Sequence, residues 1–467
     1  MNNSRLSPPP PAPFLPPAAM LSVPEFLRPV IGQNTPVAVL GAGVSGRALA
    51  ALLGKLGAAS VLYDEQNAPG APGASAGFAP ERHALVLFSP GFRPDHPWLA
   101  AARAAGALTL GELDFASLFW RGSIIAVTGT NGKTTLASFL AHALRSLKKD
   151  AAAAGNIGVP LAALAAARSG AAPESVAVCE VSSFQAETLR HFRADASLWT
   201  NFAEDHLERH RSLENYFNAK WRLFERTAGG PLFAGSGVRA AAALFGQSLP
   251  DDACVPTENQ PGDLLLKDTP FEQYPQRENF LLAAAWWRRA GLPEMALYAA
   301  ARSFRLPPHR LARVAVVNGT AFWNDSKATN FHAAEAALRS FPAPVHLILG
   351  GLSKGGDLPA FVRRAAPRVR HAWLIGATAP ALADACRAAA VPHTVAGTLD
   401  VAVRFSAAAA GKGGTVLLAP AFASFDQFKG CEERGERFIA LVKSLENPIV
   451  PPKINPSNTH PLHHETS

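Results

Sequence analysis

Short apolar segments that end in glycine turns and lead into Ala/Leu-rich stretches recur along the chain and constrain its fold. The first segment, residues 37–40, runs into a Gly-x-Gly-x-x-Gly turn that begins at Gly41, and another apolar segment follows at residues 60–63. Similar apolar segments begin at residues 123 and 345. Strands that alternate with helices predict parallel sheets covered by helices. We therefore expect an α/β protein in which three such sheets follow one another.

The length of 467 residues exceeds what one hydrophobic core usually organises, so several domains are expected. Both ends of the chain are rich in proline and predict segments that bury no core. The predicted parts are 1–30, a disordered leader; 31–110, a Rossmann-like domain; 111–306, a central domain similar to P-loop ATPases; 307–446, a second Rossmann-like domain; and 447–467, a flexible tail.

Composition excludes several classes of protein. No apolar run reaches the roughly 18 residues of a membrane helix, and no secretion signal is recognisable at the N-terminus. The four cysteines are far apart, which indicates neither disulfides nor a zinc site and favours a reducing cytoplasm. The net charge is +8, but lysine and arginine are spread thinly, so nucleic acid is not expected as a partner.

A phosphate-binding loop is predicted after the apolar segment 123–127, at the start of a helix. Backbone N–H groups at such a helix start face phosphates, Lys133 reaches the terminal ones and the Thr134 hydroxyl is placed to ligate Mg²⁺. Val127 replaces the first glycine of the full pattern, and a plain glycine turn is the alternative. The phosphate loop consists of Gly129, Thr130, Asn131, Gly132, Lys133, Thr134 and Thr135.

Acidic and imidazole side chains follow the next apolar segments. Glu180 ends the segment 176–179, where a carboxylate beside a phosphate loop is placed to ligate Mg²⁺. Acids and histidines are dense over residues 201–210, and a solvated helix start explains that segment equally well. Lys220 lies on an amphipathic stretch, and periodicity alone predicts a surface lysine there.

Six short motifs occur in the order found in the Mur ligases, which the chain resembles over residues 37–445. The last motif, together with residues 418–428, resembles the D-glutamate-adding branch of that family. The six motifs are the phosphate loop, residues 155–160, residues 180–185, residues 204–206, residues 308–310 and residues 324–330.

The resemblance implies an ATP-dependent ligase of peptidoglycan precursor synthesis. In this family a carboxylate attacks the γ-phosphate of ATP, and an amino acid then displaces phosphate from the acyl phosphate. The implied substrates are UDP-N-acetylmuramoyl-L-alanine and D-glutamate. The implied cofactors are ATP, two Mg²⁺ ions and CO₂ as a lysine carbamate. We expect a cytoplasmic monomer.

The resemblance also implies individual roles. Catalytic roles fall to Lys133, His206 and Lys220, and the metal ligands are Thr134, Glu180, His206 and carbamylated Lys220. Nucleotide contacts are expected from Asn279, Arg310 and Asp325 in addition to the phosphate loop. Contacts to the UDP-linked substrate are expected from Ser45, Asp64, Ser89, Asn156 and Ser182, and contacts to D-glutamate from Lys327, Thr329, Lys354 and Ser424.

Three positions depart from the family pattern. The usual His-Asn-x-x-Asn motif has Glu278 and Leu282 around Asn279, and Cys431 replaces an aromatic residue. The implied function has two alternatives: a related Mur or folylpolyglutamate-type ligase with another acceptor, and a nucleotide-binding regulator without catalysis. The first lacks support because the 324–330 motif is present, and the second predicts eroded metal ligands, which is not what the sequence has.

Overall fold

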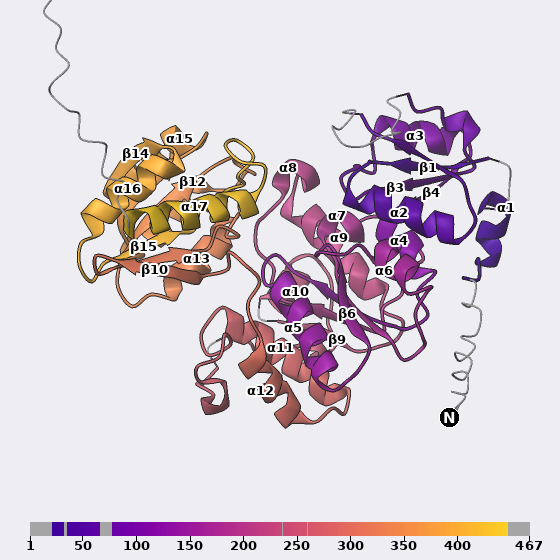
Figure 1. Cartoon of the computed structure of the whole chain (residues 1–467), viewed down its shortest axis with the longest axis horizontal. Coiled ribbons are helices and arrows are strands. Elements are labelled where there is room, and N and C mark those ends of the chain that lie inside the picture. The colour runs from indigo at the N-terminus through magenta and orange to yellow at the C-terminus, as the bar shows by residue number, and fades with distance from the viewer. Residues whose placement is uncertain (1–20, 32–34, 66–76, 236, 259, 447–467) are drawn as a thin grey trace, which may run out of the picture. The chain divides into compact units, whose positions relative to one another are not determined.

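The computed structural model consists of two compact units, Met1–Pro307 and Pro308–Ser467 (Figure 1). The structure describes residues 21–31, 35–65, 77–235, 237–258 and 260–446. The predicted tail, 447–467, lies outside the described residues, as do residues 1–20 of the predicted leader. None of the helices in the described part combines the length and hydropathy needed to cross a membrane.

The first unit begins with a four-stranded parallel sheet in the order β2-β1-β3-β4. Its glycine turn follows β1 directly, and a side chain at Gly46 would place its Cβ 1.7 Å from the Gly41 carbonyl oxygen. Only glycine therefore lets the next helix start so close to the strand end. The elements are β1 (Val37–Leu40), α2 (Val44–Lys55), β2 (Ser60–Tyr63), β3 (Leu85–Phe88), α3 (Pro97–Ala104) and β4 (Leu108–Gly111).

The predicted disorder of residues 1–30 is wrong for the described part of that segment. Residues Glu25–Leu27 form a 3₁₀ turn and Arg28–Ile31 form α1. Leu27 is fully buried, because this turn packs into the apolar core between the first sheet and the helix α2. Composition alone did not reveal this apolar anchor within a proline-rich segment.

A five-stranded parallel sheet in the order β6-β7-β5-β8-β9 forms the rest of the first unit. On one face α5 packs with α11 and α12, and on the other α6 packs against α2 and α4. The strands are β5 (Ser123–Thr128), β6 (Ala151–Gly155), β7 (Val176–Glu180), β8 (Ala196–Trp199) and β9 (Leu232–Ala234). The helices are α4 (Glu112–Ser117), α5 (Lys133–Ser146), α6 (Leu161–Ala167), α7 (Ser183–Ala186), α8 (Leu207–His210), α9 (Leu213–Glu225), α10 (Val238–Leu244), α11 (Gln276–Arg289) and α12 (Glu294–Ser303).

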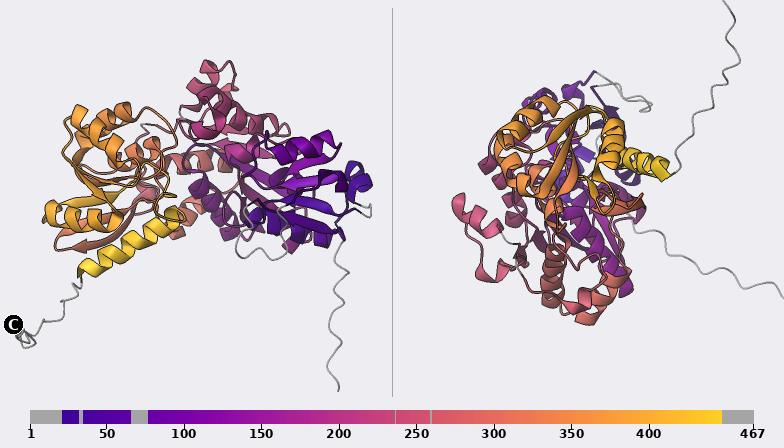
Figure 2. Two further views of the ribbon diagram at one scale, coloured as in Figure 1. Left: turned by 90° about the horizontal axis from the view of Figure 1, so that it is seen from above. Right: turned by 90° about the vertical axis from the view of Figure 1, so that its left-hand side faces the viewer.

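The second unit contains a six-stranded sheet in the order β10-β11-β15-β12-β13-β14, in which only the β10–β11 pair is antiparallel. Helices cover both faces: α13, α14 and α15 on one, α16 and α17 on the other (Figure 2). The strands are β10 (Ala312–Val317), β11 (Thr320–Asn324), β12 (Val345–Gly350), β13 (Val369–Ile375), β14 (His393–Gly397) and β15 (Thr415–Leu418). The helices are α13 (Phe331–Arg339), α14 (Leu358–Ala365), α15 (Ala379–Ala388), α16 (Leu399–Ala410) and α17 (Cys431–Glu446). The prediction of three largely parallel sheets is confirmed.

Two buried carboxylates of α4 connect the first sheet to the second. Asp114 Oδ1 accepts hydrogen bonds from three consecutive backbone N–H groups, those of residues 190–192, at 3.0, 2.8 and 2.7 Å. Glu112 Oε1 accepts one from the Ala162 N–H at the start of α6, at 2.8 Å. Because a buried polar group without partners is costly, these bonds fix where α4 packs.

We predict that Glu112 makes unfolding of the protein pH-dependent. Burial raises the pKa of Glu112 to about 7, since the hydrogen bond from Ala162 offsets only part of the desolvation. This pKa exceeds the value of 4.5 for an exposed glutamate. The free energy of unfolding is therefore highest at low pH, where Glu112 is neutral in both states, and falls as the pH rises from 4.5 through about 7. The free energy of unfolding falls by about 3 kcal/mol over this pH range.

Chemical denaturation of the wild type and Glu112→Gln at pH 5 and pH 8 measures this effect. Glutamine keeps the hydrogen bond to Ala162 but carries no charge, so the variant's stability should fall less between the two pH values. An identical pH dependence in both proteins would contradict the prediction.

Candidate active site

The site predicted in the first unit lies at the carboxyl ends of adjacent parallel strands. β5 lies between β7 and β8, so the phosphate loop after β5 has Glu180 at the end of β7 on one side. The segment that leads from β8 to His206 lies on the other side. Ligand sites of α/β sheets form at this edge, because the loops that meet there are free of the sheet's own hydrogen bonds.

The phosphate loop is held in shape by its neighbour after β8. Thr130 N–H donates to the Asn201 carbonyl and Asn131 N–H to Asn201 Oδ1, both at 3.0 Å. Gly132 has a φ of 83°, a left-handed conformation that glycine adopts without strain. Lys133 Nζ donates to the loop's own carbonyls of residues 129 and 130, at 2.9 and 2.8 Å. The lysine therefore lies over the loop, at the place where phosphate oxygens are bound in P-loops.

Asn279, a predicted nucleotide contact, lies against the phosphate loop. It is buried on α11, and a Cβ at Gly132 would come within 2.5 Å of its Oδ1. Its Nδ2 donates to Gln276 Oε1 at 2.9 Å. Only glycine fits at position 132 beside this amide, and the nucleotide role of Asn279 stays a prediction.

Lys220 is not the surface lysine that periodicity predicted. It is 1% exposed, its Nζ donates to the Gly129 carbonyl at 2.7 Å, and it lies 4.7 Å from the centre of the Tyr216 ring. Burial lowers the pKa of Lys220 well below its usual value, and the nearby charge of Lys133 lowers it further. Asp205 and Glu180 act in the opposite direction. The net effect shifts the equilibrium toward the neutral amine.

Tyr216 is a site residue that the sequence analysis missed. It is buried, its hydroxyl donates to Thr130 Oγ1 at 3.3 Å, and its ring lies beneath Lys220. Its position four residues before Lys220 places both side chains on one face of α9. That spacing was the available signal.

Glu180 has a carboxylate oxygen suited to a cation. The residue is 3% exposed, and its Oε1 accepts a hydrogen bond from Asn156 Nδ2 at 3.0 Å. Its Oε2 is buried and accepts no hydrogen bond within the described residues. Mg²⁺ binds few protein oxygens and completes its shell with water and phosphate, so this oxygen and the half-buried Thr134 hydroxyl fit one ion.

His206 caps α8 in a left-handed conformation, with a φ of 55°. Its ring centre lies 4.8 Å from that of Phe184 and 6.3 Å from that of Tyr216. Because Tyr216 also contacts Lys220, the histidine and this lysine lie around one tyrosine ring. The described residues hold no cluster of three or more His, Cys, Asp or Glu side chains suited to a metal ion.

The predicted contacts to the UDP-linked substrate in the first sheet also lie at strand ends. Asp64 follows β2, and its Oδ2 accepts a hydrogen bond from the Ala42 N–H at 2.8 Å. Ser89 follows β3, and its buried Oγ would be 2.7 Å from a Cβ at Gly41. Ser45 lies half-buried in the first turn of α2. The turn and the N-terminus of α2 thus form an edge where a diphosphate would meet backbone N–H groups.

Ser182 is the N-cap residue of α7. Its Oγ accepts a hydrogen bond from the Gln185 N–H, and Gln185 Oε1 accepts one from the Ser182 N–H, which forms a capping box. The loop that carries Ser182 thereby has a fixed shape directly after Glu180.

In the second unit, the residues predicted to contact D-glutamate lie in the loops that follow the carboxyl ends of three adjacent parallel strands. Lys327 and Thr329 follow β11, Ser424 follows β15, and Lys354 follows β12. The loops after β12 and β15 are paired, because residues 352 and 423 form an antiparallel bridge. The sheet order therefore gathers these side chains at one edge.

Asp325 and Arg310 lie close together in the second unit. Burial raises the pKa of Asp325 to about 7, while a hydrogen bond from the Leu311 N–H at 3.1 Å and the charge of Arg310 lower it in part. That Asp325 and Arg310 contact the nucleotide stays a prediction.

Lys327 has two neighbours from the start of α17. Its Nζ donates to Glu432 Oε1 at 3.0 Å and lies 3.4 Å from Cys431 Sγ. Burial lowers the pKa of Lys327, but its interactions with Cys431 and Glu432 raise that pKa by more. Lys327 in turn lowers the pKa of Glu432 to about 2, despite the opposing effect of burial. Cys431, the departure from the family pattern, thus lies directly beside the predicted D-glutamate contact.

Comparisons with known proteins identify the family and the fold. The Mur ligase middle domain matches residues 127–234, and the Mur ligase glutamate ligase domain matches residues 309–422. The UDP-N-acetylmuramate–alanine ligase of Thermotoga maritima has a TM-score of 0.54 at 15% identity, covering 88% of this chain and 100% of its own. E. coli FolC in complex with ADP has a TM-score of 0.52 at 20% identity, covering 75% and 99%. At these identities the two structures indicate a shared fold.

Sequence similarity to one branch of the family is much higher. The UDP-N-acetylmuramoylalanine–D-glutamate ligase of Solibacter usitatus is 38% identical over 440 residues, which cover 89% of this chain and 99% of the relative. The enzyme of the same name from Acidobacterium capsulatum is 35% identical over 444 residues, covering 87% and 95%. Similarity of this extent, at full length of the relatives, shows that the chain belongs to the Mur ligase family, among the UDP-N-acetylmuramoylalanine–D-glutamate ligases.

Proposed function

We propose that this protein joins D-glutamate to UDP-N-acetylmuramoyl-L-alanine with ATP, forming an amide, ADP and phosphate in peptidoglycan precursor synthesis. The observation that carries the proposal is the grouping of Lys133, Glu180 and Lys220 around the phosphate loop. The family membership of the chain supports the choice of substrates. A cytoplasmic location and a monomeric state stay predictions.

The proposed reaction has two steps. The carboxylate of the UDP-linked substrate attacks the γ-phosphorus of ATP, which gives an acyl phosphate and ADP. The amine of D-glutamate then attacks the acyl carbon, and phosphate leaves. Both steps concentrate negative charge, so the protein's part is to neutralise charge and to align the reactants. Lys133 would exchange its bonds to the loop carbonyls for bonds to phosphate oxygens.

Glu180 and Thr134 would hold a magnesium ion at the phosphates. The free Oε2 of Glu180 supports this role, since a buried carboxylate oxygen without a partner is costly unless a cation binds it. When bound, such an ion supplies positive charge at the phosphoryl oxygens.

Lys220 is suited to carry a carbamate. The neutral amine attacks CO₂, a proton is released, and the product is an anionic carbamate: R–NH₂ + CO₂ gives R–NH–COO⁻ + H⁺. Burial favours the required neutral amine. The new oxygens would add an anionic ligand beside His206 for a second magnesium ion, which a protonated lysine would repel.

D-glutamate would bind at the strand ends of the second unit. Its two carboxylates call for cationic and hydroxyl donors, which Lys327, Thr329, Lys354 and Ser424 offer. Glu432 holds the Lys327 ammonium in this structure, so a substrate carboxylate would compete with it.

We predict that phosphate release from ATP in the presence of UDP-N-acetylmuramoyl-L-alanine depends on D-glutamate. L-lysine, meso-diaminopimelate and L-alanine should each support rates lower by at least about a hundredfold. L-lysine and L-alanine have one carboxylate and leave charged groups of a site for two unpaired, and meso-diaminopimelate has two carboxylates but is longer and carries a second ammonium group that the site's lysines would repel. Lys327→Met should raise the KM for D-glutamate. Equal rates with another acceptor would favour a related ligase, and no acceptor-dependent release at all would favour a regulator.

We predict that Lys220→Ala lowers ligation by on the order of a hundredfold and that added short carboxylates restore part of it, since they replace the carbamate oxygens. Wild-type activity should also fall when bicarbonate is removed. Isotope-labelled bicarbonate should give a carbamate NMR signal in the wild type that Lys220→Ala lacks. Lys443→Ala, at an exposed position of α17, is the control. Normal turnover by Lys220→Ala would contradict the carbamate role.

A further inference from the structure

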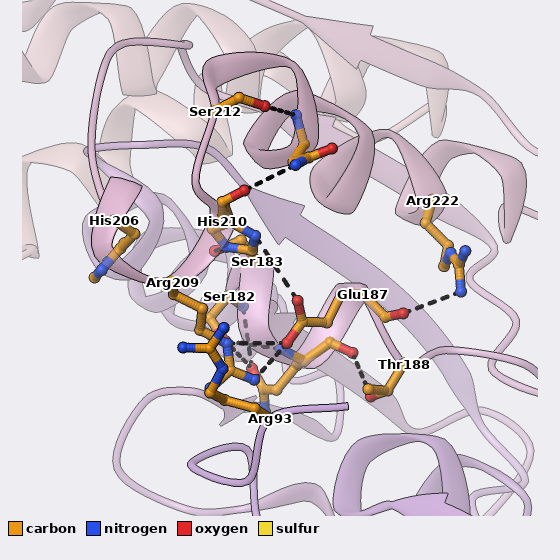
Figure 3. Close-up of polar contacts among 12 residues, drawn as sticks. Arg93, Ser182, Ser183, Glu187, Thr188, His206, Arg209, His210, Ser212 and Arg222 are labelled. Carbon is orange, nitrogen blue, oxygen red and sulfur yellow. Dashed lines mark hydrogen bonds and ion pairs between the residues drawn. The ribbon is translucent and has the colours of Figure 1, made fainter. Parts of the chain in front are cut away.

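Arg209, on the short helix α8, contacts two separate segments of the first unit. Its Nη1 donates to the Gly91 carbonyl at 3.2 Å and its Nη2 to the Phe92 carbonyl at 3.1 Å, both in the loop after β3. Its Nε donates to Glu187 Oε1 at 3.0 Å, at the end of α7, and Nη2 bonds the same oxygen. Figure 3 shows the guanidinium reaching Glu187.

The Arg209 side chain is packed rather than solvated. It is only 9% exposed, and its Cζ lies 4.1 Å from the centre of the Phe184 ring. The same ring packs edge-on against His206, which is three residues before Arg209 in the chain. The Phe184 ring therefore contacts both the Arg209 guanidinium and the His206 imidazole.

The loop that Arg209 holds carries a proposed substrate contact. Gly91 and Phe92 lie two and three residues after Ser89, and Ser89 lies against the glycine turn at Gly41. A movement of this loop away from α8 would therefore displace Ser89 relative to His206.

Around this contact, the loop and α9 face each other across a cleft of about 380 Å³. Residues 93–95 line one side, and Asn215, Asn218 and Arg222 line the other. These α9 residues lie on the helix face opposite to that of Tyr216 and Lys220, so the cleft is distinct from the proposed active site. The residues that line the cleft are mostly charged or polar, so hydrogen bonds such as those of Arg209 are the contacts available there to hold the loop.

We propose that Arg209 is a positioning residue: it fixes the loop of the proposed diphosphate contact relative to the turn that carries His206. The inference rests on the proposed function. It needs arginine specifically, because two carbonyls and a carboxylate are bonded at once by a planar group with several donors. A lysine ammonium reaches fewer of these acceptors.

The test compares steady-state kinetics of the wild type, Arg209→Lys and Arg209→Met, with each substrate varied in turn. The KM for UDP-N-acetylmuramoyl-L-alanine should rise about tenfold in Arg209→Lys and further in Arg209→Met. The KM for ATP and that for D-glutamate should change less than about threefold. A general loss of folded protein would instead lower the apparent kcat and leave every KM unchanged.

Arg211→Met is the matched control. Arg211 bonds the same loop through Asp95 at 3.5 Å, but its side chain is 73% exposed. A solvated ion pair of this kind contributes little, so this variant should behave as the wild type. If Arg211→Met raised the KM for the UDP-linked substrate as much as Arg209→Met does, charge rather than the buried bridge would be responsible, and the proposal would be overturned.

Thermal unfolding gives a second measurement. At equal concentration UDP-N-acetylmuramoyl-L-alanine should raise the Tm of the wild type more than that of Arg209→Met, while ATP should raise both equally, since a ligand stabilises the folded state according to its affinity. Should Arg209→Met fail to fold, Glu187→Gln, which loosens the same guanidinium, is expected to raise the same KM. Unchanged KM values in Arg209→Lys and Glu187→Gln would overturn the inference, whereas a wild type without D-glutamate-dependent phosphate release would overturn the proposed function.

Discussion

The parallel alignment of neighbouring strands decides where this chain gathers its polar groups. When β7, β5 and β8 lie side by side in one direction, the segments that follow them must emerge at one edge. Residues distant in sequence, such as Glu180 and Lys133, are brought together by the backbone hydrogen bonds of the sheet. The same constraint acts in the second unit on the loops after β11, β15 and β12. Side-chain bonds then refine an arrangement that the sheets impose.

This constraint also explains how much the sequence predicts. The apolar segments and glycine turns predict the strands and therefore the edge at which Glu180 and Asn156 lie. Periodicity alone wrongly predicts a surface position for Lys220, because it describes the apolar face of α9 and does not say which polar residue that face tolerates. A lysine buried on an apolar face conflicts with local preference, and such conflicts concentrate at functional sites. Leu27 was missed for the opposite reason, since its proline-rich surroundings conceal an apolar anchor.

Burial changes the charge state of several groups in this molecule, with different consequences. Desolvation raises the pKa of Glu112 to about 7 at a joint between two sheets, where the neutral form favours packing. It lowers the pKa of Lys220 beside the phosphate loop, which is the shift that the proposed carbamate requires. The physical effect is the same. The neighbours of each group distinguish the two roles: Glu112 accepts a hydrogen bond from the backbone of α6, whereas Lys220 lies against the phosphate loop.

The departures from the family pattern on α11 follow from the same division between core and edge. Leu282 is fully buried in the apolar core that α11 shares with α5, where a polar side chain would have to find a hydrogen-bond partner. Asn279 lies almost one helical turn earlier, at the phosphate loop, where an amide contacts Gly132. The leucine therefore strengthens the packing of α11, and this packing holds Asn279 against the loop. Replacement of the second asparagine is consistent with a site in which a single amide from α11 meets the nucleotide.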